Sequence, residues 1–165
     1  MTKILLVLGL VLVGLNVLLG MHYHPLMPDQ MACHFDMAGN VNGWQSKSMF
    51  YGIFYGSLAI VFFSCFLPAL LMGKLPHNMI NLPNKSYWLA PERRESTMNS
   101  VASFMMELGC VVLVLEFFIM QMVFRSNAAS SYQLPKYSMA LVILFFFYTL
   151  VKAIAYVVRF SRVPK

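Results

Sequence analysis

Charged residues are scarce in this chain: they make up 11% of its 165 residues, whereas 59% are hydrophobic. A soluble domain carries about 25% charged residues, so this composition excludes an ordinary soluble domain of this length. Acidic residues are the scarcest, with six against twelve lysines and arginines, which leaves a net charge of +6. The basic residues flank apolar runs and form no single patch, which argues against nucleic acid as a partner and favours lipid headgroups.

Cysteines and catalytic motifs are also nearly missing. Three cysteines at wide spacing give no disulfide framework. Cys65 and Cys110 fall in apolar runs and are typical of small hydrophobic residues, which leaves Cys33 as a free thiol or a metal ligand. The sequence has no Ser with a matched His and Asp, no glycine-rich phosphate loop and no paired catalytic carboxylates. These absences favour a protein that is not an enzyme.

Long apolar runs dominate the chain instead. About 20 apolar residues cross the ~30 Å hydrocarbon core of a bilayer. Four runs approach or reach this length, over residues 4–20, 49–72, 101–124 and 137–158. This pattern predicts an all-α integral membrane protein with a single membrane domain over residues 1–165. We expect its four transmembrane helices to form a compact bundle.

Lysine and arginine are divided unequally between the two sides of these runs, which predicts orientation. With the N-terminus inside, eight lie on the cytoplasmic side: Lys3, Lys74, Lys85, Arg93, Arg94, Arg159, Arg162 and Lys165. Three lie on the opposite side: Lys47, Arg125 and Lys136. We therefore expect both termini to be cytoplasmic.

Two loops follow from this orientation, an extracytoplasmic one over residues 22–47 and a cytoplasmic one over residues 74–97. Prolines and Gly/Asn pairs in the first loop are typical of turns. We expect an extended segment over residues 32–36, then a turn, together forming a small ordered cap that Trp44 anchors to the interface. In the second loop, Pro91 suits the first position of a helix that continues into the third span.

Two motifs give a family resemblance. The extracytoplasmic loop contains Pro25 to Pro28, then His34-Phe35-Asp36, Gly39, Trp44 and Ser46-Lys47, and the cytoplasmic loop contains Asn81–Lys85 and Tyr87–Arg94. This arrangement resembles a bacterial membrane-protein domain of unknown function that also heads SdpI-type proteins. The resemblance implies an integral protein of the bacterial cytoplasmic membrane. SdpI-type proteins protect against a secreted toxin and can retain a repressor at the membrane.

The extracytoplasmic loop also holds a set of residue types that bind metals. His22, His24, His34 and Asp36 supply imidazole and carboxylate ligands for zinc, and Cys33 with the loop methionines would add soft ligands for copper. Alternatively, His34 and Asp36 hydrogen-bond to the backbone and hold a tight loop together. Alternating residues on an extended segment share a face, which is compatible with both interpretations. No cofactor is required by either the composition or the motifs.

Four polar residues inside the spans need partners: Asn16, Glu107, Glu116 and Lys152. Glu107 and Lys152 lie at similar depth, so we predict that they pair. Glu116 follows Glu107 by nine residues and therefore lies on the opposite side of its helix, nearer the level of Asn16 and Ser57. This placement excludes a catalytic dyad. It leaves open a proton or ion pathway through the glutamates, or polar contacts that hold helices together.

Binding is the function that these features favour. Trp44, Trp88, Arg93 and Arg94 are candidates for contacting a partner; the alternative is that the arginines only determine topology and form local ion pairs. We expect an accessory or stabilising subunit of a membrane complex, or an immunity or signalling protein, with a membrane-protein partner or a homo-oligomer. The alternatives are metal or ligand binding by the histidine-bearing loop, and proton or ion coupling through Glu107 and Glu116.

Overall fold

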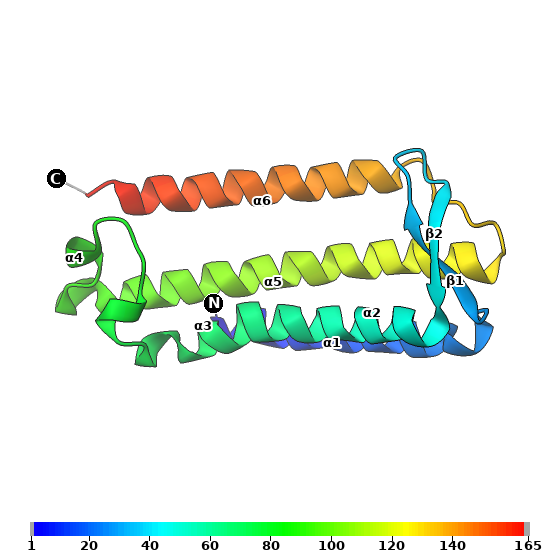
Figure 1. Cartoon of the computed structure of the whole chain (residues 1–165). Coiled ribbons are helices and arrows are strands. Elements are labelled where there is room, and N and C mark those ends of the chain that lie inside the picture. The colour runs from blue at the N-terminus through cyan, green and yellow to red at the C-terminus, as the bar shows by residue number, and fades with distance from the viewer. Residues whose placement is uncertain (1, 164–165) are drawn as a thin grey trace.

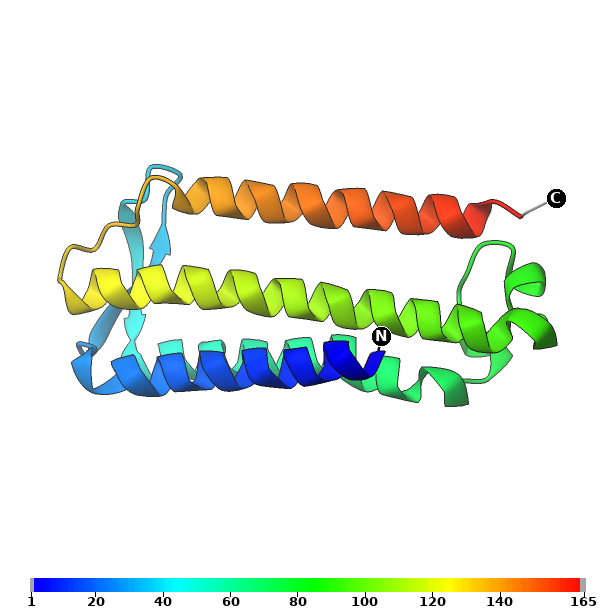
Figure 2. The same cartoon turned by 180° about the vertical axis from the view of Figure 1, so that it is seen from behind.

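Long helices run side by side in the computed structural model, which describes residues 2–163 (Figures 1 and 2). Along the chain come α1 (Thr2–Tyr23), β1 (Gln30–Phe35), β2 (Val41–Ser46), α2 (Lys47–Val61), α3 (Leu67–Leu71), α4 (Lys85–Trp88), α5 (Pro91–Ala128) and α6 (Ser138–Ser161). A π-helical turn over Phe62–Phe66 joins α2 to α3, and single 3-10 turns lie at His24–Leu26, Met72–Lys74 and His77–Met79. In this described part, four helices are long and apolar enough to cross a membrane, as predicted.

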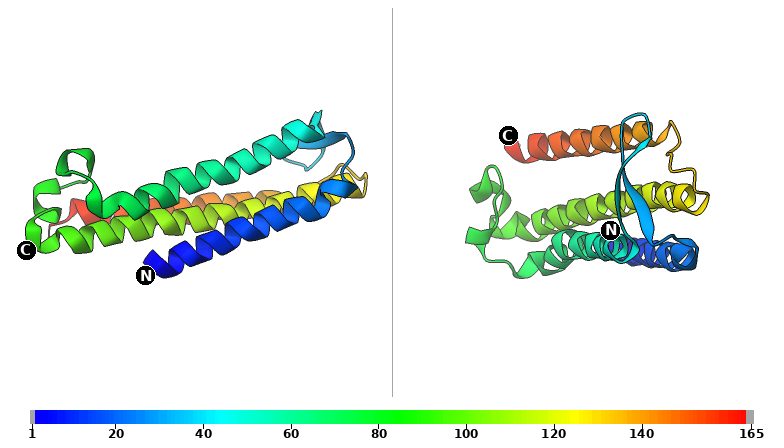
Figure 3. Two further views of the ribbon diagram at one scale, coloured as in Figure 1. Left: turned by 90° about the horizontal axis from the view of Figure 1, so that it is seen from below. Right: turned by 45° about the vertical axis from the view of Figure 1, so that its right-hand side comes forward.

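Helix α5 is the centre of the molecule. It has 38 residues and is therefore about 57 Å long, well over the ~30 Å of hydrocarbon. It begins at Pro91 as predicted, where the proline needs no hydrogen-bond acceptor and Glu92 favours the positive end of the helix dipole. Helices α1 and α2 lie against one side of α5, and α6 lies on the other side (Figure 3).

The three helices α1, α2 and α5 form the packed core. At one end the ring of Phe124 is fully buried and contacts the rings of Tyr23, Tyr51, Phe50 and Phe54. Aromatic rings from α1 and α2 therefore pack around one side chain of α5. Large flat side chains fill such a junction with few rotatable bonds, so the core at this end is rigid.

A second core contact depends on glycine. The π-helical turn carries Phe66, which is only 1% exposed, and its ring lies between Gly9 of α1 and Gly109 of α5. A Cβ atom on either glycine would overlap this ring. Small residues let membrane helices approach closely, and here the space between the two helices is filled by a ring from a third segment.

Helix α6 is the most loosely packed of the four long helices: among its apolar residues only Phe160 belongs to the buried core, with Tyr156 packed against it. It contacts α5 through a stack of Tyr156 on Phe104 and an ion pair between Lys152 and Glu107, and near its end Phe160 packs against Trp88 of α4. Most of its other apolar side chains stay exposed. Water would penalise such an exposed face, whereas lipid does not. In a bilayer a helix therefore needs only a few specific contacts to stay attached, and α6 makes such contacts.

The segment between α1 and α2 folds into an antiparallel hairpin of β1 and β2 that crosses one end of the helices (Figure 1). We call this end the hairpin end, and the opposite end, where α4 lies, the α4 end. The predicted extended segment over residues 32–36 is confirmed for residues 32–35, and the all-α prediction misses only this small sheet. Which end faces the cytoplasm stays a prediction, and Lys165 lies outside the described residues.

Candidate functional site

A cavity of about 470 Å³ lies between the hairpin, α2 and α5 at the hairpin end. Its walls are mainly apolar, and polar groups occur at its rim and its floor. The lining residues are Cys33, His34, Gln45, Phe50, Ile53, Phe54, Ser57, Glu116 and Met120. An apolar cavity with a few convergent polar groups is typical of a binding site for a small molecule.

The floor of this cavity, which we call the Glu116 cavity, is a polar contact between two helices. The Ser57 hydroxyl of α2 hydrogen-bonds to Oε1 of Glu116 on α5, and it also lies 2.6 Å from the carbonyl oxygen of Phe54. A hydroxyl has one proton, so it donates fully to only one of these oxygens at a time. When Ser57 donates to Phe54, a protonated Glu116 donates to Ser57; when Glu116 is ionised, it accepts from Ser57. The geometry is therefore compatible with both a protonated and an ionised Glu116.

The rim of the Glu116 cavity is formed by the hairpin. The Cys33 thiol donates to the carbonyl oxygen of Gly43 across the hairpin, at 3.4 Å. Burial raises the pKa of the Cys33 thiol, so it stays protonated at neutral pH. His34 is exposed at the rim and pairs with Gly43, where any larger residue would collide with its ring. The rim thus offers polar, uncharged groups and one imidazole.

The four predicted metal ligands are not brought together. The ring of His22 meets Tyr23 edge-on, and the ring of His24 meets Tyr51, whereas His34 lies at the rim of the cavity. Within residues 2–163, no group of three or more His, Cys, Asp or Glu side chains is placed to hold a metal ion. Zinc or copper binding by this set stays a prediction that the described geometry does not favour.

Asp36 has the structural role that we considered as the alternative. Its Oδ1 accepts hydrogen bonds from the backbone N–H groups of Ala38 (2.9 Å) and Asn40 (2.8 Å), and its Oδ2 accepts from the Asn40 side chain (3.3 Å). Gly39 completes the turn with a φ of 85°, which favours glycine. The N–H of Asn40, above all, holds the pKa of Asp36 below its ordinary value, despite an opposing effect of desolvation. The His34-Phe35-Asp36…Gly39 pattern is therefore a hairpin turn.

The hairpin is fixed to α5 by Asn127, a residue that sequence reasoning did not single out. Its side chain is 1% exposed, and it accepts from the N–H of Ala32 at 2.8 Å and donates to the carbonyl oxygen of Ala32 at 3.0 Å. Trp44 is 48% exposed on the opposite strand, where its ring meets Tyr132 edge-on. The segment between α1 and α2 is thus held against α5, and anchoring or partner binding by Trp44 stays a prediction.

At the α4 end, the second motif holds the end of α6. The Asn84 amide donates to the carbonyl oxygens of Phe160 (3.1 Å) and Ser161 (2.9 Å), and the Trp88 indole donates to that of Phe160 at 2.8 Å. The last carbonyls of a helix have no partner within the helix, and these side chains supply one. We call Asn84 and Trp88 the α6 clamp.

The two arginines of the same motif are also engaged within the chain. Arg93 donates to the carbonyl oxygen of Tyr87 and lies over its ring, and Arg94 donates to the carbonyl oxygen of Leu75 at 2.7 Å. Both are half-buried. Partner binding by Trp88, Arg93 and Arg94 stays a prediction, while the contacts that the structure gives them are structural.

The intramembrane polar residues occur on two sides of α5. Lys152 Nζ lies 2.7 Å from Glu107 Oε1, so the predicted pair is present, and Tyr148 donates to the same oxygen at 2.6 Å. Glu116 faces α2 instead, which confirms that the glutamates are not one dyad. Asn16 of α1 donates to the carbonyl oxygen of Leu113 on α5 at 3.1 Å. Each of these polar groups joins two helices.

The four apolar helices define a multi-pass membrane protein. Residues 11–56 match the family model of a domain of unknown function, DUF1648, which covers the second half of α1, the hairpin and the first part of α2. Comparisons with curated proteins and with solved structures each gave no match. The matched segment includes the rim and one wall of the Glu116 cavity, whereas Glu116 itself lies outside it.

Proposed function

We propose that this chain is a non-enzymatic membrane protein that acts by binding, and that it binds a small organic cation in the Glu116 cavity. The proposal depends on one observation: a carboxyl group forms the floor of a largely apolar cavity of about 470 Å³ that has an open polar rim. A cavity of this size takes up most of a small ligand, and its few polar groups select the ligand's charge.

The carboxyl group of Glu116 at the floor indicates a positively charged ligand. An ionisable group inside a membrane is costly unless it has a partner, and Glu116 has a serine hydroxyl but no cation beside it among residues 2–163. Phe50 and Phe54 line the walls of the cavity, and aromatic side chains attract cations. An organic cation with an apolar body satisfies both the walls and the floor.

The direction of access follows from the predicted orientation. If the hairpin end faces away from the cytoplasm, as the unequal division of lysine and arginine favours, the cavity receives its ligand from outside. A protein with this site is suited to the immunity or signalling role of SdpI-type proteins, which respond to secreted compounds. It is equally suited to be an accessory subunit that delivers or withholds a ligand from a membrane complex.

The experiment compares two ions of the same shape and opposite charge, tetraphenylphosphonium and tetraphenylborate. Each is titrated into nanodiscs that contain the purified protein, and binding to empty nanodiscs is subtracted. We expect saturable binding of the cation alone. Binding should weaken as the pH falls, because protons compete for Glu116. Equal binding of the anion, or no saturable binding of the cation, would overturn the proposal.

Two variants make the test specific. Glu116→Gln keeps the shape and the hydrogen bond of Ser57, and it should abolish both the binding of the cation and its pH dependence. Glu107→Gln makes the same chemical change on the same helix but on the side of α6, so it should bind like the wild type. If both variants lose binding equally, the site is not the Glu116 cavity.

The biological setting is tested separately by native mass measurement on gently solubilised membranes. An accessory subunit should migrate inside a larger assembly, whereas an immunity-type protein should migrate alone or as a homo-oligomer. Trp44 is the exposed aromatic residue of the cap, so Trp44→Ala should weaken an assembly that forms at the hairpin end without unfolding the protein.

A further inference from the structure

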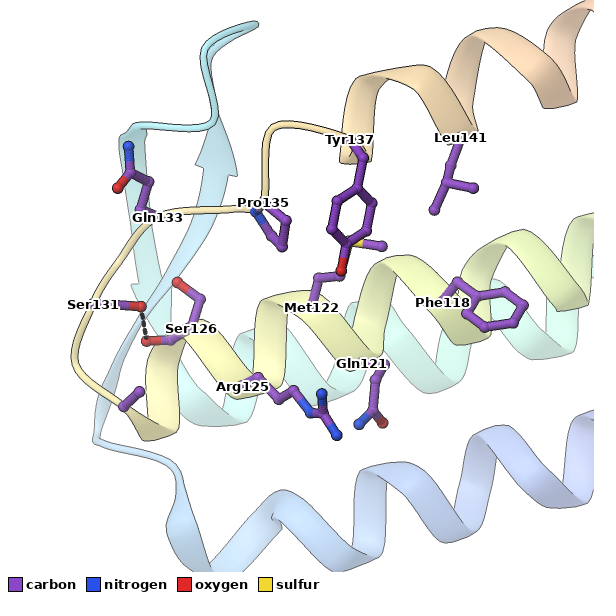
Figure 4. A pocket seen from close by; sticks show the side chains of 11 residues that line it. Phe118, Gln121, Met122, Arg125, Ser126, Ser131, Gln133, Pro135, Tyr137 and Leu141 are labelled. Carbon is purple, nitrogen blue, oxygen red and sulfur yellow. Dashed lines mark hydrogen bonds between the residues drawn. The ribbon is translucent and has the colours of Figure 1, made fainter.

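A second cavity, of about 630 Å³, lies between α5 and α6 at the hairpin end (Figure 4). Polar side chains line its outer part, including Gln121, Arg125, Ser126, Ser131 and Gln133, and Tyr137 of the loop before α6 points across it toward Met122. No acidic residue is among the residues that line it.

This cavity continues along the helices into an apolar one. A further cavity of about 360 Å³ lies deeper between α5 and α6, and its walls are almost purely apolar, with Val111, Val114, Leu115, Leu144 and Phe145 among them. Phe118 and Leu141 line both cavities. The two cavities therefore form one groove, which we call the α5–α6 groove, polar at the hairpin end and apolar toward the middle of the membrane.

The polar part of the groove contains a buried group without a partner. The Ser126 side chain is 4% exposed, and its Oγ makes no hydrogen bond to any part of the chain that the structure describes. Figure 4 shows this hydroxyl projecting from α5 toward the segment that carries Gln133 and Pro135. The nearby Ser131 hydroxyl donates to the backbone carbonyl of Ser126 at 3.3 Å and so leaves the hydroxyl of Ser126 unused. A buried hydroxyl without a partner is unfavourable, and an acceptor in the groove would satisfy it.

The same part of the groove has positive charge that the protein does not neutralise. Arg125 lines the cavity and is exposed, and Lys136 follows within the adjoining loop. Between residues 2 and 163, the only ion pair is that of Glu107 and Lys152, so neither cation has a carboxylate partner. The groove thus offers a guanidinium and a free hydroxyl, which suits a phosphate group. The amides of Gln121 and Gln133 already donate to Tyr23 and Asn40.

We propose that the α5–α6 groove binds one anionic phospholipid, with its headgroup at Arg125 and Ser126 and one acyl chain along the apolar part. The length of the groove fits this occupant. From Val111 to Arg125 the helix rises about 21 Å, which covers one leaflet of hydrocarbon, about 15 Å, and the headgroup layer. In this arrangement the acyl chain fills the apolar cavity between α5 and α6. This inference is independent of the cation site.

The experiment measures which lipids stay with the protein. The protein is purified in mild detergent, stripped of lipid, and titrated with phosphatidylglycerol or phosphatidylcholine of identical acyl chains, and bound lipid is counted by native mass spectrometry. We expect one phosphatidylglycerol per chain, held about tenfold more tightly than phosphatidylcholine, because a charge-assisted hydrogen bond to Arg125 recognises the anionic headgroup. Equal retention of the two lipids, or no retained lipid, would overturn the inference.

Variants separate the headgroup from the acyl chain. Arg125→Gln should remove the preference for phosphatidylglycerol while binding to phosphatidylcholine stays unchanged. Leu144→Trp fills the apolar part and should reduce the binding of both lipids. Lys74→Gln is the matched control, because it removes an exposed basic residue at the α4 end and should leave the preference intact. A preference lost equally in Lys74→Gln, or a protein segment recovered in the groove in place of lipid, would contradict the assignment.

Discussion

The side-chain amide of Asn127 pairs with both backbone groups of Ala32 and so acts as a third strand for one residue of the hairpin. The same amide donates to the carbonyl oxygen of Val123 in its own helix, which fixes its rotamer. Ala32 is fully buried, so its N–H and carbonyl have no access to water at this point. Through this contact the end of α5 helps to position the hairpin, which forms the rim of the Glu116 cavity.

Replacing Asn127 tests this contact. Asn127→Ala leaves two backbone groups of Ala32 buried without partners, so we expect it to lower the free energy of unfolding by about 2–4 kcal/mol. The largest increase in the rate of hydrogen exchange should occur at the hairpin amides and not in α5. Asn127→Asp puts a buried carboxyl group against the carbonyl oxygens of Ala32 and Val123, so it should give at least as large a loss. Unchanged exchange of the Ala32 amide in Asn127→Ala would show that the hairpin is held by other contacts.

The turn at Asp36 should open in acid. The pKa of Asp36 is lowered in the folded protein, chiefly by the N–H of Asn40, so its ionised form stabilises the turn. That stabilisation is fully present above the ordinary aspartate pKa of about 3.9 and is lost as the pH falls through the lower, folded-state value. Nuclear magnetic resonance of the Ala38 and Asn40 amides should report this loss below pH ~4. Asp36→Ala should abolish the pH dependence; amides that still titrate there would point to another group.

Sequence reasoning predicted the features that depend on composition and depth. Four spans, the start of α5 at Pro91, and the pairing of Glu107 with Lys152 all follow from apolar length, proline geometry and the cost of a lone charge in lipid. The extended segment of the hairpin follows from local alternation. Each of these depends on residues close in sequence or on a single distance along a helix.

The remaining features depend on contacts between distant segments. Asn127 and Ala32 are 95 residues apart, and nothing near either one indicates the other. Trp88 and Arg94 look like exposed partner-binding residues in the sequence, yet in the structure each binds a backbone carbonyl of a distant segment. The Glu116 cavity is likewise lined by residues of the hairpin, α2 and α5, so its lining could not be predicted from the histidine-bearing loop alone.

The glycines beside Phe66 should tolerate no side chain. Gly109→Leu places atoms where the Phe66 ring lies, and overpacking of this kind costs about 1–3 kcal/mol. Thermal unfolding in detergent measures the loss. Phe66→Ala in the same chain should restore part of the stability by making room. Gly14→Leu is the control, because nothing lies within 4 Å of a Cβ atom at Gly14. If it destabilises the protein equally, collision with the Phe66 ring does not explain the effect, because leucine has the higher helix propensity.

The pair of Glu107 and Lys152 should be coupled in a double-mutant cycle. Glu107→Gln, Lys152→Gln and the double variant should give a coupling energy of about 0.5–2 kcal/mol, since polar contacts inside membranes contribute this much. Exchanging the two residues, as Glu107→Lys with Lys152→Glu, should recover most of the stability. Additive effects of the two single changes would mean that Lys152 reaches the interface on its own and that Glu107 depends on Tyr148.

The α6 clamp should decide whether α6 stays attached at the α4 end. Asn84 has a φ of 50°, which glycine adopts easily, so Asn84→Gly keeps the backbone and removes only the two hydrogen bonds to α6. Trp88→Phe likewise keeps a ring against Phe160 but removes the donor. A spin label on Arg162 should become more mobile in both variants, and most in their combination, while a label on Lys47 at the hairpin end should not change.

Copurification of any partner separates the two roles of Trp88: if Trp88 also binds a partner, Trp88→Phe should weaken copurification more than Asn84→Gly does at equal mobility of α6. Equal loss in the two variants would mean that the partner recognises only the docked position of α6.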